Sequence, residues 1–287
     1  MSVKVLKTIK LFIGGAFPRT ESGRVEAIHF AKSSAPAGGA SIYANICKAS
    51  RKDLRTAVEA AEAASGNWSK LSAYNRGQIL YRVAEMIEGR RPEFAQLFAE
   101  TLGWDAKRSA SEVDGAIDAF VYYAGFCDKL TQVRGTVNAV ASRHHVFTMP
   151  EPVGVVAAIL PDHFSFEGMC VDLASLLAGA NTVVALLGKG CPAVLAPFSE
   201  SLATSDLPAG VVNLLTGDLE ELHSHLGSHM EIRAVSYQHE SQAILAKIQV
   251  LGVENMKRIV VSGPQLPPLK RITSFVEYKT AWHPVGA

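Results

Sequence analysis

Short, continuous hydrophobic runs recur through the second half of the chain. They lie at about 153–160, 181–187, 211–216, 232–237 and 257–262, and segments with helical periodicity separate them. A strand that is apolar at every position is typical of a parallel sheet covered by helices on both faces. The pattern therefore predicts an α/β fold with a Rossmann-like parallel sheet of about five strands.

The first half of the chain has a different rhythm. Residues 1–45 are rich in Gly, Ser, Ala and Pro, which favours an extended arm with one or two strands. Ser50 followed by Asp53 is close to a capping box at a helix start, and Leu54, Val58 and neighbouring alanines give that helix an apolar face. An N-terminal helical layer is therefore predicted. Its further helices are expected at 79–87, from 92 to 103, and over 113–124.

Two segments lack helical periodicity and predict a small β element. Residues 132–151 alternate weakly and indicate a pair of strands, while residues 270–283 alternate and indicate a last strand. A lone strand with an unpaired edge requires a partner. We therefore predict one domain from 1–131 and 152–263, a β element from 132–151 and 270–283, and a Pro-rich linker at 264–269.

Composition narrows the class of protein. The chain has 28 Lys plus Arg against 27 Asp plus Glu, so its charge favours neither nucleic acid nor an anionic membrane. The apolar runs have strand length, far short of a membrane span, and the N-terminus shows no signal-peptide pattern. Four widely spaced cysteines indicate reduced thiols in a cytoplasmic protein, without a disulfide framework or a zinc site.

Candidate chemistry gathers at the stretch EPVGVVAAILPDHFSFE, residues 151–167. Turns at the carboxyl end of parallel strands are where open α/β sheets bind ligands. Asp162 and His163 lie in such a turn and are interpreted as an exposed polar remnant. Cys170, seven residues beyond His163, is expected to be a buried structural thiol rather than a nucleophile.

Two other patterns admit a functional and a structural interpretation. His223, His225 and His229 lie close together, but Gly227 is expected to end their helix, which favours a solvated loop over a metal site. The stretch from Gly188 to Pro192 matches no phosphate-binding motif and is interpreted as a helix start.

A series of segments, in the family's order, resembles the aldehyde dehydrogenase superfamily over nearly the whole chain. They are LFIGGAFPRTESG, NWSKLSAYNRGQILYRVAEMIE, the strand and turn of EPVGVVAAILPDHFSFE, the pair LLAGANTVVALLGKGCP and LPAGVVNLLTG, and the last strand SFVEYKTAW. The resemblance implies an NAD-binding domain and a β element that extends the sheet of a neighbouring subunit.

Departures from the family pattern fall on its functional positions. The family's oxyanion-holding Asn is His163 here, and its ribose-binding Lys and Glu are Leu186 and Lys189. The family's Phe-Thr-Gly-Ser-Thr turn becomes residues 235–239, without Gly. The segment that supplies the family's general-base Glu becomes VVSGP around Gly263, where no carboxylate lies.

The family places its nucleophilic Cys in a catalytic domain that precedes the last strand. Here about six residues, 264–269, separate the two matching segments, whereas a domain needs at least about 50 residues. The resemblance therefore implies a truncated, catalytically inactive member without catalytic residues, similar to the degenerate second half of the superfamily's long two-part members. We expect no cofactor and no metal; NAD(H) binding is the alternative, as is an aldehyde oxidoreductase whose catalytic residues come from another chain.

The expected partner is a second copy, most simply in a dimer, or an active aldehyde dehydrogenase. The resemblance assigns two sets of positions. Vestigial cofactor positions are Ile159, Leu160, Pro161, His163, Leu186, Gly188, Lys189, Gly217 and Gln238. Oligomerisation positions are Val137, Val140, Val146, Phe275, Val276, Tyr278, Thr280 and Trp282.

Overall fold

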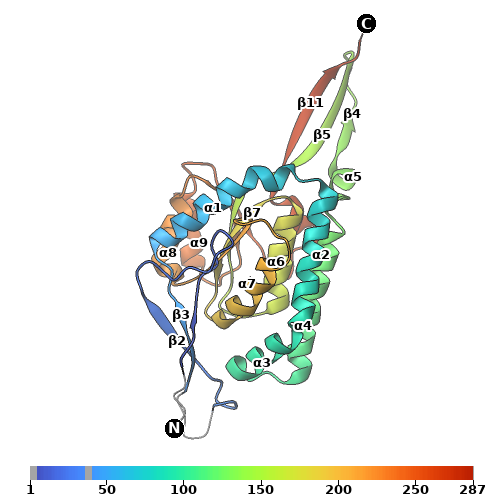
Figure 1. Ribbon diagram of the computed structural model, residues 1–287. Helices are drawn as coiled ribbons and strands as arrows, with labels where there is room; N and C mark the ends of the chain where they lie inside the picture. The colour runs from blue at the N-terminus through green and yellow to red at the C-terminus, as the bar shows by residue number, and fades with distance from the viewer. Residues whose placement is uncertain (1–4, 36–40, 287) are drawn as a thin grey trace.

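A five-stranded parallel sheet forms the centre of the computed structural model, which describes residues 5–35 and 41–286 (Figure 1). The strands are β6 (Val155–Ile159), β7 (Thr182–Leu187), β8 (Val212–Thr216), β9 (Ile232–Tyr237) and β10 (Arg258–Val261). They lie in the order β10-β9-β6-β7-β8, so β6, the first along the chain, takes the middle position. All five predicted strands are confirmed, and every residue of β6, β7 and β8 is buried.

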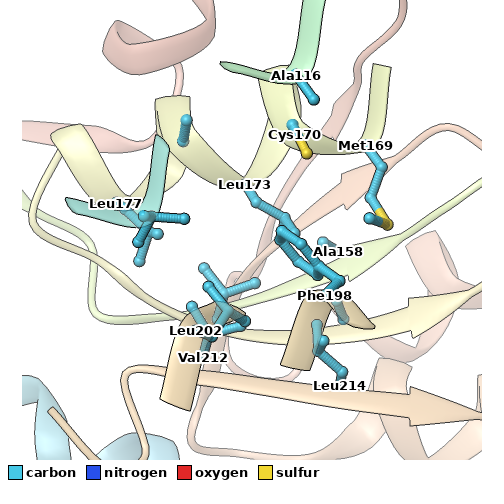
Figure 2. Close-up of a cluster of buried hydrophobic side chains, with 14 of the residues drawn as sticks. Ala116, Ala158, Met169, Cys170, Leu173, Leu177, Phe198, Leu202, Val212 and Leu214 are labelled. Atoms are coloured by element: carbon cyan, nitrogen blue, oxygen red, sulfur yellow. The ribbon is translucent and has the colours of Figure 1, made fainter. Parts of the chain in front are cut away.

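Helices cover both faces of this sheet, as its continuous apolar strands predict. Alternate residues of β6 face opposite sides: Val156 and Ala158 join one hydrophobic cluster, whereas Val155 and Ala157 join the other. The first cluster lies under α6 (Phe166–Ala178) and α7 (Leu195–Ala203), which follows the short 3-10 helix Pro192–Val194. The second lies under α8 (Leu219–Ser228) and α9 (Gln242–Leu251), together with the first helix of the chain. Figure 2 shows Leu173 of α6 and Phe198 of α7 packed together near Ala158.

The N-terminal helical layer is confirmed. Ser50 accepts a hydrogen bond from the backbone N–H of Asp53, and the Asp53 carboxylate accepts from the backbone N–H of Ser50, which completes a capping box. Gly103, in the left-handed conformation at φ 70°, ends the third helix. The five helices are α1 (Arg51–Lys70), α2 (Ala73–Gly89), α3 (Arg91–Leu102), α4 (Ala106–Ala124) and α5 (Leu130–Arg134).

The predicted N-terminal arm contains β1 (Thr8–Ile9), β2 (Val25–His29) and β3 (Ile42–Cys47). β3 lies in the middle, parallel to β1 and antiparallel to β2. The arm is joined to the central sheet at Phe12, which exchanges two backbone hydrogen bonds with Leu214. It is therefore laid on the core, as expected.

A second small sheet projects from the body (Figure 1). It consists of β4 (Thr136–Asn138), β5 (His144–Pro152) and β11 (Val276–Pro284), in the order β11-β5-β4 with antiparallel pairing. We call this sheet the β-arm. It supplies the partner that the last strand requires, since all nine residues of β11 pair with β5.

The prediction was wrong for the segment before β11. Residues 264–275 were interpreted as a linker and the start of a strand, but α10 (Pro268–Thr273) lies there. Proline at its start favours a helix. Ile272 and Ser274 alternate in polarity like residues of a strand. However, Ile272 and Phe275 have the three-residue spacing of a helical turn, and both pack into the core near α6. Phe275, only 1% exposed, therefore belongs to the core and not to a strand.

Among the described residues, no helix is long and apolar enough to cross a membrane.

The Asp53 carboxylate is expected to contribute strongly to stability. It accepts hydrogen bonds from the backbone N–H of Ser50 (2.8 Å), the Thr20 hydroxyl (2.7 Å) and the backbone N–H of Glu21 (3.2 Å). Asp53→Ala should lower the free energy of unfolding by about 2–3 kcal/mol, because it removes a helix cap and leaves buried donors unpaired. Urea denaturation would measure this, and exposed Asp118, changed to Ala, should cost under about 0.5 kcal/mol. Equal effects of the two changes would contradict the role of the cap.

Candidate functional site

Two neighbouring cavities lie at the carboxyl ends of the parallel strands. The smaller, of about 120 Å³, lies between the turns that follow β6, β7, β8 and β9. The larger, of about 280 Å³, is lined mostly by apolar side chains from the β6 turn and α6. All nine positions assigned to a vestigial cofactor site line one or both cavities. These positions gather at the carboxyl edge of the sheet, where open α/β sheets bind ligands.

The turn after β6 is held by an acidic side chain from the turn after β9. One carboxylate oxygen of Glu240 accepts a hydrogen bond from the backbone N–H of Asp162 (3.3 Å), and the other accepts from the backbone N–H of His163 (3.1 Å). Backbone N–H groups in such turns are donors that a bound phosphate can use. Here a carboxylate of the same chain engages them.

The turn after β7 is closed against the turn after β6. The Asp162 carboxylate accepts a hydrogen bond from the backbone N–H of Lys189 at 2.8 Å. The backbones approach so closely that a Cβ added at Gly188 would lie 1.9 Å from the carbonyl oxygen of Pro161. A side chain at Gly188 would therefore force the two turns apart.

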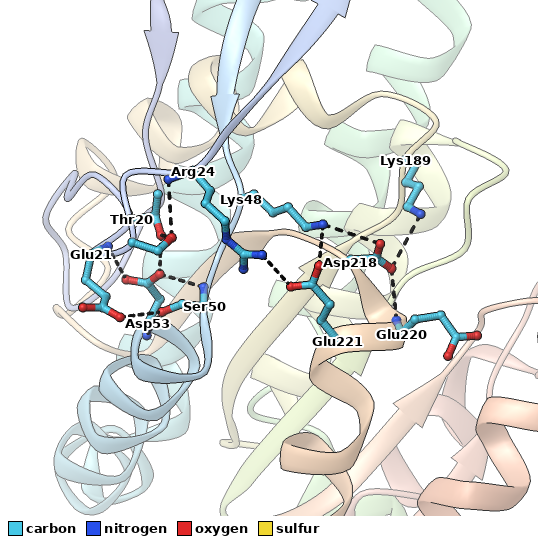
Figure 3. A network of polar contacts seen from close by, with 11 residues as sticks. Thr20, Glu21, Arg24, Lys48, Ser50, Asp53, Lys189, Asp218, Glu220 and Glu221 are labelled. Carbon is cyan, nitrogen blue, oxygen red and sulfur yellow. Dashed lines mark hydrogen bonds and ion pairs between the residues drawn. The ribbon is translucent and has the colours of Figure 1, made fainter.

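A network of charged side chains, shown in Figure 3, adjoins the smaller cavity, which Lys189, Asp218 and Glu220 line. The ammonium group of Lys189 lies 3.7 Å from Asp218, which caps α8 by accepting from the backbone N–H of Glu220. Lys48 from the N-terminal arm reaches both Asp218 (3.7 Å) and Glu221 (2.6 Å). This network ties the N-terminal arm, the β7 turn and α8 together around the cavity.

His239 lies between the two acidic residues, and one of its ring nitrogens is engaged by the backbone. Its Nδ1 accepts a hydrogen bond from the backbone N–H of Ser241 at 3.1 Å, so the neutral ring carries its hydrogen on Nε2. That Nε2 lies 3.5 Å from Asp162 and 3.9 Å from Glu240. The three side chains have the spacing of a metal site, with ligand atoms within 4.8 Å of one another. In this tautomer the hydrogen on Nε2 faces the two carboxylates.

The cysteines nearest the larger cavity are poor nucleophiles. Cys170 is fully buried on α6, and burial raises the pKa of its thiol well above the usual range. Cys191 lines the cavity, but burial raises its pKa to about 12. Because the thiolate is the reactive form, neither residue is set up for covalent catalysis. The prediction that Cys170 is structural is confirmed by its burial.

A buried polar cluster, which no sequence pattern predicted, lies near Gly263 of the larger cavity. The two carboxylate oxygens of Asp172 on α6 accept from the Ser236 hydroxyl at 2.9 and 3.0 Å, and that hydroxyl lies 2.6 Å from the hydroxyl of Ser262. Buried Arg271 donates hydrogen bonds to the carbonyls of Gly263 and Leu266 (3.1 Å). Burial raises the pKa of Asp172 to about 6, although the Ser236 hydrogen bond and the charge of Arg271 lower it.

The three clustered histidines of α8 lie elsewhere. α8 ends at Ser228, one residue beyond Gly227, so the helix ends close to the position expected from the sequence. Gly227 is buried against Leu251 of α9, where a larger residue would not fit. His229 caps the helix, and its Nδ1 accepts from the backbone N–H of Glu231 at 3.3 Å.

Most positions assigned to oligomerisation lie in the β-arm. Val137, Tyr278 and Trp282 are 71%, 44% and 59% exposed. Thr280 is exposed beside them, and Val140 is half-buried between β4 and β5. Val146, Phe275 and Val276 are buried, so their side chains offer no surface to a partner.

The sequence reasoning missed Glu240, His239, Asp218, Asp172 and Arg271. A signal existed for three of them, since Asp218, His239 and Glu240 directly follow strands of the sheet and so lie at its carboxyl edge. Asp172 and Arg271 gave no comparable signal, because their proximity depends on how α10 folds back toward α6.

The fold is that of a Rossmann-type α/β protein. It has a parallel sheet in the order β10-β9-β6-β7-β8, helices on both faces, and cavities between the turns at the carboxyl end of the strands. The aldehyde dehydrogenase family model matches residues 26–263, and the chain belongs to that family. It is 30% identical over 255 residues to human cytosolic 10-formyltetrahydrofolate dehydrogenase, covering 87% of this chain and 28% of the relative. It is 28% identical to D-glyceraldehyde dehydrogenase (NADP(+)) of Thermoplasma acidophilum, covering 88% of this chain and 49% of the relative.

Solved structures agree with the sequence relatives. A putative aldehyde dehydrogenase from Burkholderia cenocepacia matches with a TM-score of 0.79 and 28% identity, over 89% of this chain and 50% of that one. The NAD+ complex of an aldehyde dehydrogenase from Bacillus cereus matches with a TM-score of 0.78 and 25% identity, over 88% of this chain and 50% of that one. The chain therefore spans between about a quarter and a half of the length of these relatives.

Asp172 predicts a pH dependence of stability. Its folded-state pKa, about 6, is raised above the ordinary value of 3.8. The stability it contributes is therefore fully present below pH 4 and is lost as the pH rises through 6. Between pH 4 and pH 7, Asp172→Asn should gain about 3 kcal/mol in free energy of unfolding relative to the parent chain. Urea denaturation across this range, with exposed Asp118→Asn as the control, would test it; parallel pH profiles for the parent chain and Asp172→Asn would contradict the assignment.

Proposed function

We propose that this chain is a catalytically inactive member of the aldehyde dehydrogenase family that acts as a structural or regulatory oligomerising subunit. The observation that carries the proposal is the connection from β10 to α10, which spans only residues 262–267. The resemblance implies that the family's catalytic domain, with its nucleophilic Cys, lies in this interval. Six residues leave room for neither a domain nor its thiolate.

The chemistry of the described site supports the same conclusion. Covalent aldehyde oxidation needs a thiolate, a base and donors for the oxyanion. Cys170 and Cys191 have raised pKa values, and the acceptor nitrogen of the neutral His239 ring, Nδ1, is engaged by the backbone N–H of Ser241. His163 lies at the position of the family's oxyanion-holding Asn, exposed in the turn.

The contacts of the turns argue against NAD in the family's binding mode. A dinucleotide needs backbone donors for its phosphates, but Glu240 engages those of residues 162 and 163, and Asp162 engages that of Lys189. Two carboxylates at this place would also repel a pyrophosphate. Leu186 offers no donor to a ribose hydroxyl. The residues present therefore do not fit the cofactor, and we propose that it is not bound.

The β-arm supplies the surface for assembly. It projects from the body and exposes apolar side chains such as Val137 and Trp282. The outer edges of β4 and β11 pair with no other strand among the described residues, and such edges favour addition of a strand from another chain. We propose a homo-oligomer, most simply a two-fold dimer, or a hetero-oligomer with an active aldehyde dehydrogenase.

One observation favours a second candidate function. The 280 Å³ cavity is well formed and lined by Phe164 and Met169, with His163 and Gln238 as polar groups. Such a cavity suits a small ligand. The alternative is therefore an NAD(H)-binding module, or a subunit that completes its catalytic site with residues of another chain.

Calorimetric titration with NAD+ and NADH, together with an assay of aldehyde-dependent NADH formation, would separate these functions. We expect neither heat at millimolar ligand nor turnover by the pure protein. Turnover by the pure chain would overturn the proposal, and turnover only on mixing with a second chain would favour the alternative.

The variant Glu240→Ala would show whether this carboxylate excludes the cofactor. It frees the backbone N–H groups of Asp162 and His163, so weak NADH binding should appear in the variant. Glu254→Ala, at an exposed turn before β10, is the control and should leave the titration flat. No binding by Glu240→Ala would mean that the carboxylate is not the cause.

Trp282 provides the test of assembly through the β-arm. Trp282→Ser should shift the native mass measured by light scattering from an oligomer toward a monomer, because it removes an exposed apolar side chain from the proposed interface. Tyr74→Ser on α2, another exposed aromatic at 66%, should leave the mass unchanged. An unchanged mass for Trp282→Ser would place the interface elsewhere.

A further inference from the structure

The tip of the β-arm brings two histidines together that are far apart in the sequence. His145 of β5 and His283 of β11 are directly opposite each other in the antiparallel register. Directly opposed residues of an antiparallel pair point to the same face, with Cβ atoms about 4.5–5.5 Å apart. The two side chains therefore project from the same face of the sheet.

Ring contacts confirm the faces on which His145 and its neighbour His144 lie. His145 packs against Phe147, two residues along the same strand, with ring centroids 5.7 Å apart. Its neighbour His144 faces the other side, where it packs edge-on against Trp282 at 5.7 Å. Successive residues of a strand point to opposite faces, so His144 and His145 cannot chelate together. The residue opposite His145 comes from another strand.

Both imidazoles are free to bind. His145 and His283 are exposed, and among the described residues no hydrogen bond or ion pair engages a ring nitrogen of either. His144, in contrast, lies 3.0 Å from the hydroxyl of Ser142. The nearest ion pair of the β-arm, Lys279 with Glu151 at 2.5 Å, lies toward the base of the sheet.

From this geometry we propose that His145 and His283 form a two-histidine site for a late first-row divalent cation such as Zn²⁺ or Cu²⁺. Neutral imidazole is a preferred ligand of these ions, with Zn–N distances of about 2.0–2.1 Å. Opposed positions let both rings reach one ion by rotation about their side-chain bonds. Water completes the coordination, so each chain binds one ion.

The test is calorimetric titration of the full chain, carrying no histidine tag, with ZnCl₂. His283→Asn and His145→Asn should each weaken binding roughly 100-fold, because each leaves one imidazole without its chelating partner. His144→Asn is the matched control, adjacent in sequence but on the other face, and should bind like the parent chain. Since all three positions are exposed, the thermal unfolding midpoint should not change.

A second measurement locates the ion independently. Substoichiometric Cu²⁺ should broaden the NMR signals of Phe147 and Ala281, which lie beside the pair on the same face, before those of the Asp162–His239–Glu240 turn. Unchanged Zn²⁺ affinity of His283→Asn, an equal loss in His144→Asn, or broadening centred on the turn would each overturn the proposal.

Discussion

Burial of β6 on both faces is the constraint on which the rest of the structure depends. A strand in the middle of a parallel sheet cannot face water on either side, so two separate helical layers must cover it. Its alternate residues divide between two hydrophobic clusters, one under α6 and α7 and the other under α1, α8 and α9. Because helices cover both faces, the turns that follow the strands lie at the carboxyl edge of the sheet. The position of the candidate site follows from the core.

Much of the fold could be predicted because the core leaves its pattern in the sequence. The strands were recognisable as continuous apolar runs, and the start of α1 from its Ser50 and Asp53 capping box. The errors fell where a local pattern had two meanings. Ile272 and Ser274 alternate like a strand, but Ile272 and Phe275 lie on one face of a helical turn and pack into the core. Gly227 lies one residue before the end of α8, and its lack of a side chain also allows close packing against Leu251.

The site was predictable in position but not in chemistry. The nine assigned residues line the cavities because they follow strands of the sheet. The side chains that determine the properties of the site come from elsewhere: the Glu240 carboxylate binds backbone N–H groups 77 and 78 residues earlier in the chain. No local pattern specifies such a contact, since it depends on how the β6 and β9 turns meet. The resemblance to the family predicts that its oxyanion-holding Asn and its ribose-binding Lys and Glu are absent. The structure shows that the carboxylates of Glu240 and Asp162 bind the backbone N–H groups of the turns.

The pairing within the β-arm has a consequence for how the molecule is made. Thr148 of β5 and Thr280 of β11 share a hydrogen bond at 2.8 Å, yet they are separated by 132 residues. Contacts between such distant segments form slowly, because a long loop must close before they contribute stability. During synthesis, β5 leaves the ribosome long before β11 and has only the short β4 as a partner until then. The β-arm is therefore completed only after every strand of the central sheet has been synthesised.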